Sequence, residues 1–360
     1  MAEGQVDSRA VTAALSGFLD PETGRDVMET GQIRDVKVAG ESLSLTLALS
    51  SHSAVLHNET RLRLAQSLEQ KFPQLKRVTV DLAVHERPVE KIGQIGLAAK
   101  SVVAVGSGKG GVGKSTIAAV LALGLARAGS RVGLMDADVY GPSIPHLLGV
   151  NRRPEVIENR IQPIEVSGLK VISMGFLVPP GEAVVWRGPM LHGAITQFLR
   201  DTAWGELDYL IIDMPPGTGD IALTLSQLLP LSGAVVVCTP QDVALLDAVK
   251  AVAMFRKVNI PILGMVENMS GFVCPGCGKR YDIFGSGGAK ARAAELGIGF
   301  LGEVPIQIAI RVAGDEGRTS TNFEDPTSAK YLSAICENTV RSLSQMKAQT
   351  APLPTLTVGP

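Results

Sequence analysis

The chain of 360 residues is 45% hydrophobic and has a formal net charge of −1. This length and apolar content predict two domains, each with a core of its own. Because the sequence contains no basic run, no stripe of aromatic residues and arginines and no apolar run of roughly 18 residues, we expect neither nucleic-acid binding nor a membrane span.

Residues 1–90 predict a small α+β domain. Residues 42–50 and 77–84 alternate polar or small residues with apolar ones, as strands do, and the segment 33–38 precedes them. Residues 58–72 have the spacing of a helix, for which Asn58 is a candidate N-cap. We expect His52 and His57 to be solvent-facing loop residues rather than metal ligands.

A glycine-rich run at 106–116 reads Gly-Ser-Gly-Lys-Gly-Gly-Val-Gly-Lys-Ser-Thr and fits the phosphate-loop pattern. It follows an apolar strand candidate at 101–105 and precedes a helix candidate at 117–128. Glycines let backbone amides turn inward around a phosphate, and the start of the helix favours an anion. Lys114 then reaches the β and γ phosphates, and Ser115 can ligate magnesium. The predicted nucleotide-binding residues are Gly108, Lys109, Gly110, Gly111, Val112, Gly113, Lys114, Ser115 and Thr116.

Two later strand candidates are each followed directly by aspartates. Residues 131–135 are followed by Asp136 and Asp138, and residues 207–212 by Asp213. The carboxyl ends of parallel strands are the edge at which open α/β sheets bind ligands. The sequence therefore places these side chains beside the phosphate loop.

Strand and helix candidates alternate after residue 100, which predicts an α/β domain with a mostly parallel sheet over 101–348. A linker is predicted at 91–100, within a stretch that mixes charges with Pro and Gly. The proline-containing tail at 349–360 is expected to be disordered. Asp220 is interpreted as a helix N-cap or turn residue.

Lys109 is a second lysine that an ordinary phosphate loop does not need, and it could simply be a solvated loop residue. The run Lys-Gly-Gly-Val-Gly-Lys-Ser, however, resembles the deviant Walker A motif of the ATPase group containing chromosome-partition, septum-site and nitrogenase iron proteins. This resemblance implies a P-loop NTPase fold. It also implies a homodimer in which Lys109 reaches the nucleotide of the partner subunit.

The same resemblance assigns roles to the residues at the strand ends. Asp138 is implied to orient the attacking water, with Asp136 in a supporting role. Asp213 corresponds to the Walker B carboxylate, which holds magnesium through water. Gly217 lies where a backbone amide can sense the γ phosphate. Since phosphoryl transfer depends mainly on positioning and charge neutralisation, this small set suffices for a slow, switch-like ATP hydrolase.

Asn268 follows a strand candidate at 261–266 and could hydrogen-bond the nucleotide base. In guanine-binding relatives, an Asn at this strand end is followed three residues later by an Asp that pairs with guanine. Gly271 occupies that position here, so ATP is the expected nucleotide.

Cys274 and Cys277 form a Cys-Pro-Gly-Cys element whose tight turn brings two sulfurs close enough to share a metal or cluster. Cys238 and Cys336 fall in a strand and a helix candidate and are expected to be buried packing residues. A second subunit in the implied homodimer could supply the two further thiolates of a four-thiolate site. Such a site can hold zinc or an iron–sulfur cluster, and half a zinc ribbon or a redox dithiol also remains open.

Six elements in order resemble the Mrp (ApbC) family of iron–sulfur cluster carrier ATPases over residues 98–345. They are the phosphate loop, Asp-Ala-Asp-Val-Tyr-Gly-Pro-Ser at 136–143, Trp-Arg-Gly-Pro-Met at 186–190, Asp-Met-Pro-Pro-Gly-Thr-Gly-Asp at 213–220, Glu-Asn-Met-Ser at 267–270 and the Cys-Pro-Gly-Cys element. The resemblance implies a 4Fe-4S cluster bridged between subunits by Cys274 and Cys277. It further implies transfer of that cluster to apoproteins under the control of ATP, with a possible scaffold protein as cluster source.

The first domain resembles the iron–sulfur assembly domain often fused ahead of such ATPases. Those domains frequently carry a cysteine where this sequence reads Ser-His-Ser at 51–53, so target docking or scaffolding is expected here rather than cluster binding. An acidic N-terminus without a signal and few cysteines favour a cytoplasmic location. Two other functions remain: a zinc-stabilised partition or positioning ATPase, and an electron-transfer iron protein.

Overall fold

The computed structural model describes residues 6–177, 188–217 and 219–349. Its contacts divide the chain into two units, Met1–Arg87 with Val340–Pro360, and Pro88–Thr339. The second boundary falls inside helix α10 (Pro326–Gln349), whereas the sequence assigned 101–348 to one domain. Uninterrupted helical spacing hides this boundary. No described helix is long and apolar enough to cross a membrane.

The first unit is a three-stranded sheet covered by helices, which confirms the predicted α+β domain. Its elements are α1 (Ser8–Leu15), β1 (Ile33–Ala39), β2 (Ser42–Leu49), η1 (Ser51–Leu56), α2 (His57–Lys71) and β3 (Arg77–Val84). The strand order is β1-β2-β3, with β1 antiparallel and β3 parallel to the central β2. Alternate leucines of β2, including Leu45 and Leu47, are buried in one core with Leu64 and Leu68 of α2. Their period of two is the signal that predicted the strand.

Two details of the first unit correct the sequence analysis. Helix α2 has Leu56 as its N-cap, and Asn58 lies within the helix, where its Oδ1 accepts from Arg61 Nη2 at 2.8 Å. His52 is only 1% exposed because residues 51–56 form the 3-10 helix η1 instead of a solvent-facing loop. His57 Nε2 lies 2.9 Å from the Ser50 carbonyl oxygen, and burial lowers the pKa of its imidazole.

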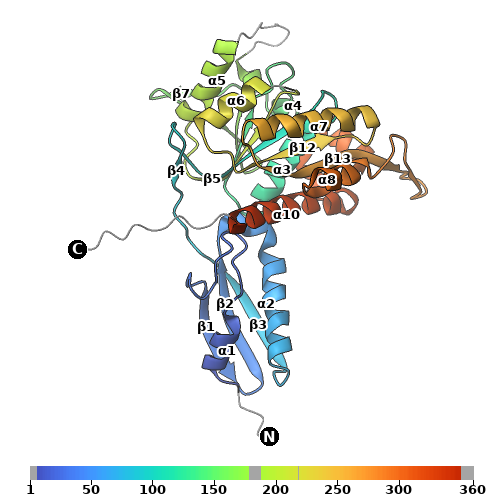
Figure 1. Cartoon of the computed structure of the whole chain (residues 1–360). Helices are drawn as coiled ribbons and strands as arrows, with labels where there is room; N and C mark the ends of the chain where they lie inside the picture. Colours follow the sequence, from blue (N-terminus) through green and yellow to red (C-terminus); the bar gives the residue numbers. More distant parts are fainter. Residues whose placement is uncertain (1–5, 178–187, 218, 350–360) are drawn as a thin grey trace. The chain divides into compact units, whose positions relative to one another are not determined.

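The second unit is a ten-stranded, mostly parallel sheet with helices on both faces (Figure 1). The sheet order is β14-β13-β12-β5-β11-β6-β10-β9, with β15 beside β13 and β4 beside β5. Its strands are β4 (Lys91–Ile92), β5 (Leu97–Ser107), β6 (Val132–Asp136), β9 (Ile164–Val166), β10 (Leu169–Ser173), β11 (Leu207–Asp213), β12 (Gly233–Cys238), β13 (Ile262–Val273), β14 (Arg280–Tyr281) and β15 (Phe300–Ile306), and a separate hairpin joins β7 (Val156–Ile157) to β8 (Arg160–Ile161). Its helices are α3 (Lys114–Ala128), α4 (Ile144–Leu147), η2 (Met174–Phe176), α5 (Gly188–Asp201), α6 (Gly219–Leu228), α7 (Asp242–Lys257), α8 (Gly288–Leu296), α9 (Ile308–Asp315) and η3 (Thr319–Phe323), followed by α10.

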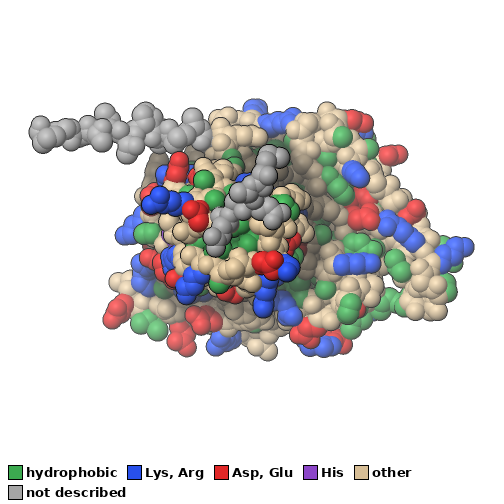
Figure 2. Space-filling model, turned by 90° about the horizontal axis from the view of Figure 1, so that it is seen from below, with side chains coloured by type: hydrophobic (Ala, Val, Ile, Leu, Met, Phe, Trp, Pro, Cys, Tyr) green, Lys and Arg blue, Asp and Glu red, His purple; other side chains and the backbone are tan. Residues whose placement is uncertain are grey.

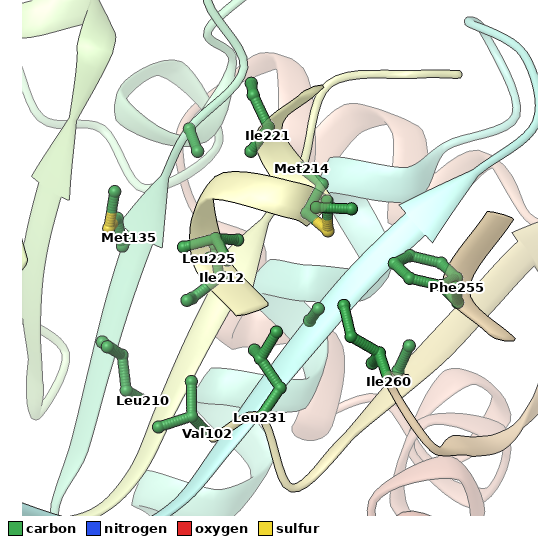
Figure 3. Packing of buried hydrophobic residues seen from close by; sticks show 14 of the residues in the cluster. Val102, Met135, Leu210, Ile212, Met214, Ile221, Leu225, Leu231, Phe255 and Ile260 are labelled. Carbon is green, nitrogen blue, oxygen red and sulfur yellow. The ribbon is translucent and has the colours of Figure 1, made fainter. Parts of the chain in front are cut away.

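The main core lies between the sheet and helices α5, α6 and α7. Figure 3 shows Leu225 of α6 close to Ile212 of β11 and Ile221 of α6 close to Met214, and these residues share one buried cluster with Phe255 of α7. Strand β11 is buried at every position, as expected for a central parallel strand covered on both faces. Helix α3 covers the opposite face, where it contacts β5, β6 and β11. This layering fixes the carboxyl ends of the parallel strands at one edge.

The predicted linker at 91–100 is partly structured. Strand β4 pairs antiparallel with the start of β5, and β5 already begins at Leu97. The mixture of charges, Pro and Gly concealed a two-residue strand.

Of the predicted tail at 349–360, Gln349 ends α10, and residues 350–360 lie outside the described residues. On the face seen in Figure 2, acidic and basic side chains are interspersed.

Candidate functional site

The loop between β5 and α3 borders a cavity of about 460 Å³, which we call the phosphate cavity. Gly111 and Gly113 both have φ of +79°, a left-handed conformation that a side chain would strain. Gly113 is the N-cap of α3, so the positive end of this helix lies beside the cavity. The predicted residues that line the cavity are Lys109, Gly110, Gly111, Gly113, Lys114, Ser115 and Thr116. Gly108 and the buried Val112 belong to the loop without lining the cavity.

Lys114 is held by the carboxylates predicted to act with it. Its Nζ lies 2.5 Å from Asp213 Oδ1 and 3.5 Å from Asp138 Oδ2, and its side chain is 6% exposed. Asp213 Oδ2 is buried and has no hydrogen-bond partner among the residues that the structure describes. The lysine is thus paired internally, and one oxygen of Asp213 remains available to a further donor such as metal-bound water.

Asp136 and Asp138 have different structural roles, because Asp138 faces the phosphate cavity and Asp136 is buried behind it. Asp138 lines the cavity, and its Oδ1 accepts from the amides of Tyr140 and Gly141 at 3.1 and 3.2 Å. Asp136 is fully buried and accepts from Asp138 N, Ile144 N and Ser173 Oγ. Burial, followed by repulsion from Asp213, raises the pKa of Asp136 to about 8. Asp136 therefore positions the loop that carries Asp138.

The backbone amide of Gly217 already has a hydrogen-bond partner within the protein. Its amide donates to the Ser107 carbonyl oxygen at 3.0 Å, so contact with a γ phosphate requires that bond to break. Asp220 is the second residue of α6 and lies in its first turn, so the interpretation as an N-cap or turn residue was wrong. Thr218 lies outside the described residues, as do Trp186 and Arg187 of the 186–190 motif.

Asn268 connects β13 to the phosphate loop. Its Nδ2 donates to the Val112 carbonyl oxygen at 2.9 Å, and a Cβ at Gly113 would lie 2.1 Å from that nitrogen. Asn268 also lines a second cavity, of about 500 Å³, which shares Gly113 and Thr116 with the phosphate cavity. The two cavities are therefore adjacent, as a nucleotide with a base and phosphates requires.

The rest of this second cavity was not predicted. It is mostly apolar and is lined by Met269 of β13, Pro305 and Ile306 of β15 and Ile310 of α9, among others. Because flat purine rings suit such walls, we call this second cavity the base cavity. The sequence signal is the Val-Pro-Ile segment at 304–306, but its use depends on β15 pairing beside β13, which local patterns do not reveal.

Cys274 and Cys277 lie in the turn of a hairpin between β13 and β14. Cys274 N donates to the Lys279 carbonyl oxygen at 3.0 Å, and Gly278 N donates to the Cys274 carbonyl oxygen at 2.8 Å. The backbone amides of Gly276 and Cys277 lower the pKa of the Cys274 thiol. Cys277 is exposed. A thiolate stabilised by amides on an accessible turn is a competent metal ligand.

The other two cysteines are buried, as predicted, and burial raises the pKa of Cys238 and of Cys336 to about 12. In the part of the chain that the structure describes, no three His, Cys, Asp or Glu side chains form a group that could hold a metal. The hairpin therefore presents two thiols by itself.

The strand, phosphate loop and helix, with carboxylates at the ends of two neighbouring parallel strands, define a P-loop NTPase. Residues 98–340 match the family described as NUBPL iron-transfer P-loop NTPase, and residues 8–82 match a family of iron–sulfur cluster assembly proteins. The chain belongs to this family of iron-transfer P-loop NTPases, which confirms the resemblance inferred from the motifs.

Relatives with assigned names agree with this membership. An iron–sulfur cluster carrier protein of Deinococcus radiodurans is 45% identical over 348 residues, which cover 94% of this chain and 98% of that protein. The iron–sulfur cluster transfer protein NUBPL of Dictyostelium discoideum is 47% identical and covers 72% of this chain and 81% of its own length. Among solved structures, an ADP-bound nucleotide-binding protein of Archaeoglobus fulgidus matches with a TM-score of 0.57 and 41% identity, over 65% of this chain and 92% of that one.

Proposed function

We propose that this protein is an ATP-hydrolysing carrier that binds a 4Fe-4S cluster between two subunits and passes it to apoproteins. The observation that carries the proposal is the hairpin that holds the half-buried Cys274 and the exposed Cys277, and that continues β13, the strand lining the base cavity. Two thiols per chain fit half of a four-thiolate site, so two copies supply a complete ligand set. The names of the relatives favour an iron–sulfur cluster over structural zinc.

The phosphate cavity fits a magnesium nucleotide. The loop and the start of α3 provide amides for the phosphates, and Ser115 and Asp213 are the residues that would hold Mg²⁺, the latter through water. Magnesium neutralises charge on the phosphates. When phosphates bind, Lys114 exchanges its contacts with Asp213 and Asp138 for phosphate oxygens, which frees Asp138 to orient water.

In this proposal, Gly217 and Lys109 make contacts that depend on which nucleotide is bound. The amide of Gly217 leaves the Ser107 carbonyl for the γ phosphate, so its loop differs between ATP and ADP. Lys109, which lines the phosphate cavity, reaches the nucleotide of the second copy. Hydrolysis is slow because a carrier needs a timed change of dimer geometry more than turnover. Docking of recipient apoproteins or a scaffold is assigned to the first unit.

The test is iron and acid-labile sulfide analysis of protein purified and loaded without oxygen. We expect matched iron and sulfide in the wild type, and loss of both in Cys274→Ser and Cys277→Ser. Cys238→Ala is the matched control, since Cys238 is buried in β12 and should leave the cluster content unchanged. Zinc without sulfide would contradict the proposal and favour a zinc-stabilised positioning ATPase. Unchanged cluster content in both Ser variants would contradict the assigned ligands.

A further inference from the structure

Strand β13, which leads into the hairpin of Cys274 and Cys277, is kinked between the base cavity and that hairpin. In β13, Met269 has φ of +60° and Gly271 has φ of +70°. The pairing of β13 with β15 shifts register between Asn268 and Phe272. A methionine in the left-handed region is uncommon, and such strain persists only where the surrounding structure imposes it. Met269 also lines the base cavity, so the kink begins where the base is expected to bind.

Arg280 clamps this kink from the returning strand β14. Its Nη2 donates to the carbonyl oxygen and hydroxyl of Ser270 at 3.2 and 3.3 Å, and its Nη1 donates to Glu303 Oε1 at 3.0 Å. Its Nε donates to Asp282 Oδ1 at 3.2 Å. A Cβ at Gly271 would lie 2.7 Å from this Nε, so the guanidinium packs directly on the kinked backbone. Nη2 therefore joins the hairpin to β13 and Nη1 joins it to β15, while Nε is held within the returning segment by Asp282.

A second set of hydrogen bonds, made by Ser270 and Glu267, links the kink to the part of β13 next to the phosphate loop. The Ser270 hydroxyl lies 2.6 Å from both Glu267 Oε1 and Glu303 Oε2. Glu267 is fully buried and also accepts from Gly287 N and Ala289 N at the start of α8. Glu267 directly precedes Asn268, whose side chain holds the phosphate loop. Both ends of the segment that carries the cysteines are thus tied to the strand that faces the nucleotide.

We propose that the kink at residues 268–271, clamped by Arg280 and Glu303, couples occupancy of the nucleotide cavity to the arrangement of Cys274 and Cys277. The inference rests on the proposed function and adds its regulation. A base that contacts Asn268 and Met269 shifts the start of the kink, and the clamp transmits the shift because Arg280 ties the hairpin to Ser270 and Glu303. Arg280 is a positioning residue that touches neither nucleotide nor cluster.

The test uses the full chain, loaded anaerobically with iron and sulfide. The rate at which a ferrous chelator removes iron is measured with and without a non-hydrolysable magnesium ATP analogue. In the wild type we expect the analogue to change this rate by about fivefold or more. Arg280→Met should reduce the change to less than about twofold while ATP binding is retained. Arg280→Lys should restore part of the response, because lysine keeps the charge without the planar fork.

The matched control is Arg292→Met. The Arg292 side chain is 36% exposed, against 37% for Arg280, and forms an ion pair with Glu295 within α8. This variant should keep the full wild-type response. If Arg280→Met loses the cluster outright, Met269→Gly provides the second test, since it relaxes the left-handed backbone without altering the clamp and should also weaken the response.

Several outcomes separate this inference from the function on which it rests. A wild-type response in Arg280→Met, or in Met269→Gly when Arg280→Met loses its cluster, overturns the coupling. A wild type that binds cluster but releases it at the same rate with and without nucleotide also overturns the coupling and leaves the carrier function standing. A wild type that binds no cluster contradicts the carrier function itself.

Discussion

The phosphate loop and the cysteine hairpin follow β5 and β13 of the same sheet, but they are held in different ways. The loop is surrounded by buried groups, and its Lys114 is paired with two nearly inaccessible carboxylates. The hairpin projects beyond the sheet and is anchored at its base by the partly exposed Arg280. The difference suggests that the nucleotide region is preorganised, whereas the cysteine region can be repositioned.

Loss of the Lys114 charge should have the largest effect. We expect Lys114→Ala to lower ATP hydrolysis about 100-fold or more, because the phosphates lose their main side-chain cation. Cluster binding by the nucleotide-free protein should survive, since the hairpin lies elsewhere. Phosphate release assays and iron analysis measure the two effects. Lys250→Ala, at an exposed residue of α7, is the control. Joint loss of hydrolysis and cluster would show that the two regions are less independent than proposed.

Asp138→Asn separates positioning of water from binding of ATP. The asparagine Oδ1 can still accept from the amides of Tyr140 and Gly141, so the loop should keep its shape. We expect hydrolysis to fall about 100-fold, with the affinity for ATP nearly unchanged. Single-turnover hydrolysis and nucleotide titration distinguish these quantities. Normal turnover would remove Asp138 from the reaction.

The raised pKa of Asp136 predicts that the stability of the folded protein depends on pH. Its pKa is about 8 in the folded protein, above the value of 3.8 expected when unfolded, because burial favours the neutral acid. The folded state therefore binds the extra proton between these values, and stability falls as pH rises toward 8. Thermal unfolding of nucleotide-free, magnesium-free protein between pH 5 and 8 measures this slope. Asp136→Asn should flatten it. A variant as pH-dependent as the wild type would assign the slope to other groups, such as the neighbouring Asp213.

The smallest effect is expected from a single exposed ion pair of the hairpin. Asp282→Asn removes the negative charge of one partner of Arg280, whose contacts with Glu303 and Ser270 remain. Since both members of the pair are solvent-exposed, the loss should cost less than about 1 kcal/mol. Chemical denaturation and iron content measure the outcome. A large loss of cluster would show that the hairpin depends on each anchor separately.

The sequence predicted those parts of the site that depend on local chemistry. Glycines that permit left-handed backbone, a strand that ends in a carboxylate and a tight Cys-Pro-Gly-Cys turn each act within a few residues. The mostly parallel sheet and the small first domain also followed from residue periodicity, and both are confirmed. Cys238 and Cys336 were correctly expected to be buried.

Features that depend on distant pairing were missed. The base cavity needs β15 beside β13, and the Arg280 clamp joins residues from β13, β14 and β15. The kink at Met269 cannot be predicted from a residue that rarely adopts positive φ. His52 was placed in solvent because a short polar run gave no sign that η1 would be buried.

The central claim is that two copies of the chain share one cluster. Native mass spectrometry of protein loaded without oxygen, before and after addition of a magnesium ATP analogue, tests it most directly. We predict a species of two chains with one 4Fe-4S cluster, absent from Cys277→Ser. A single chain that retains a complete cluster in every nucleotide state would contradict the account.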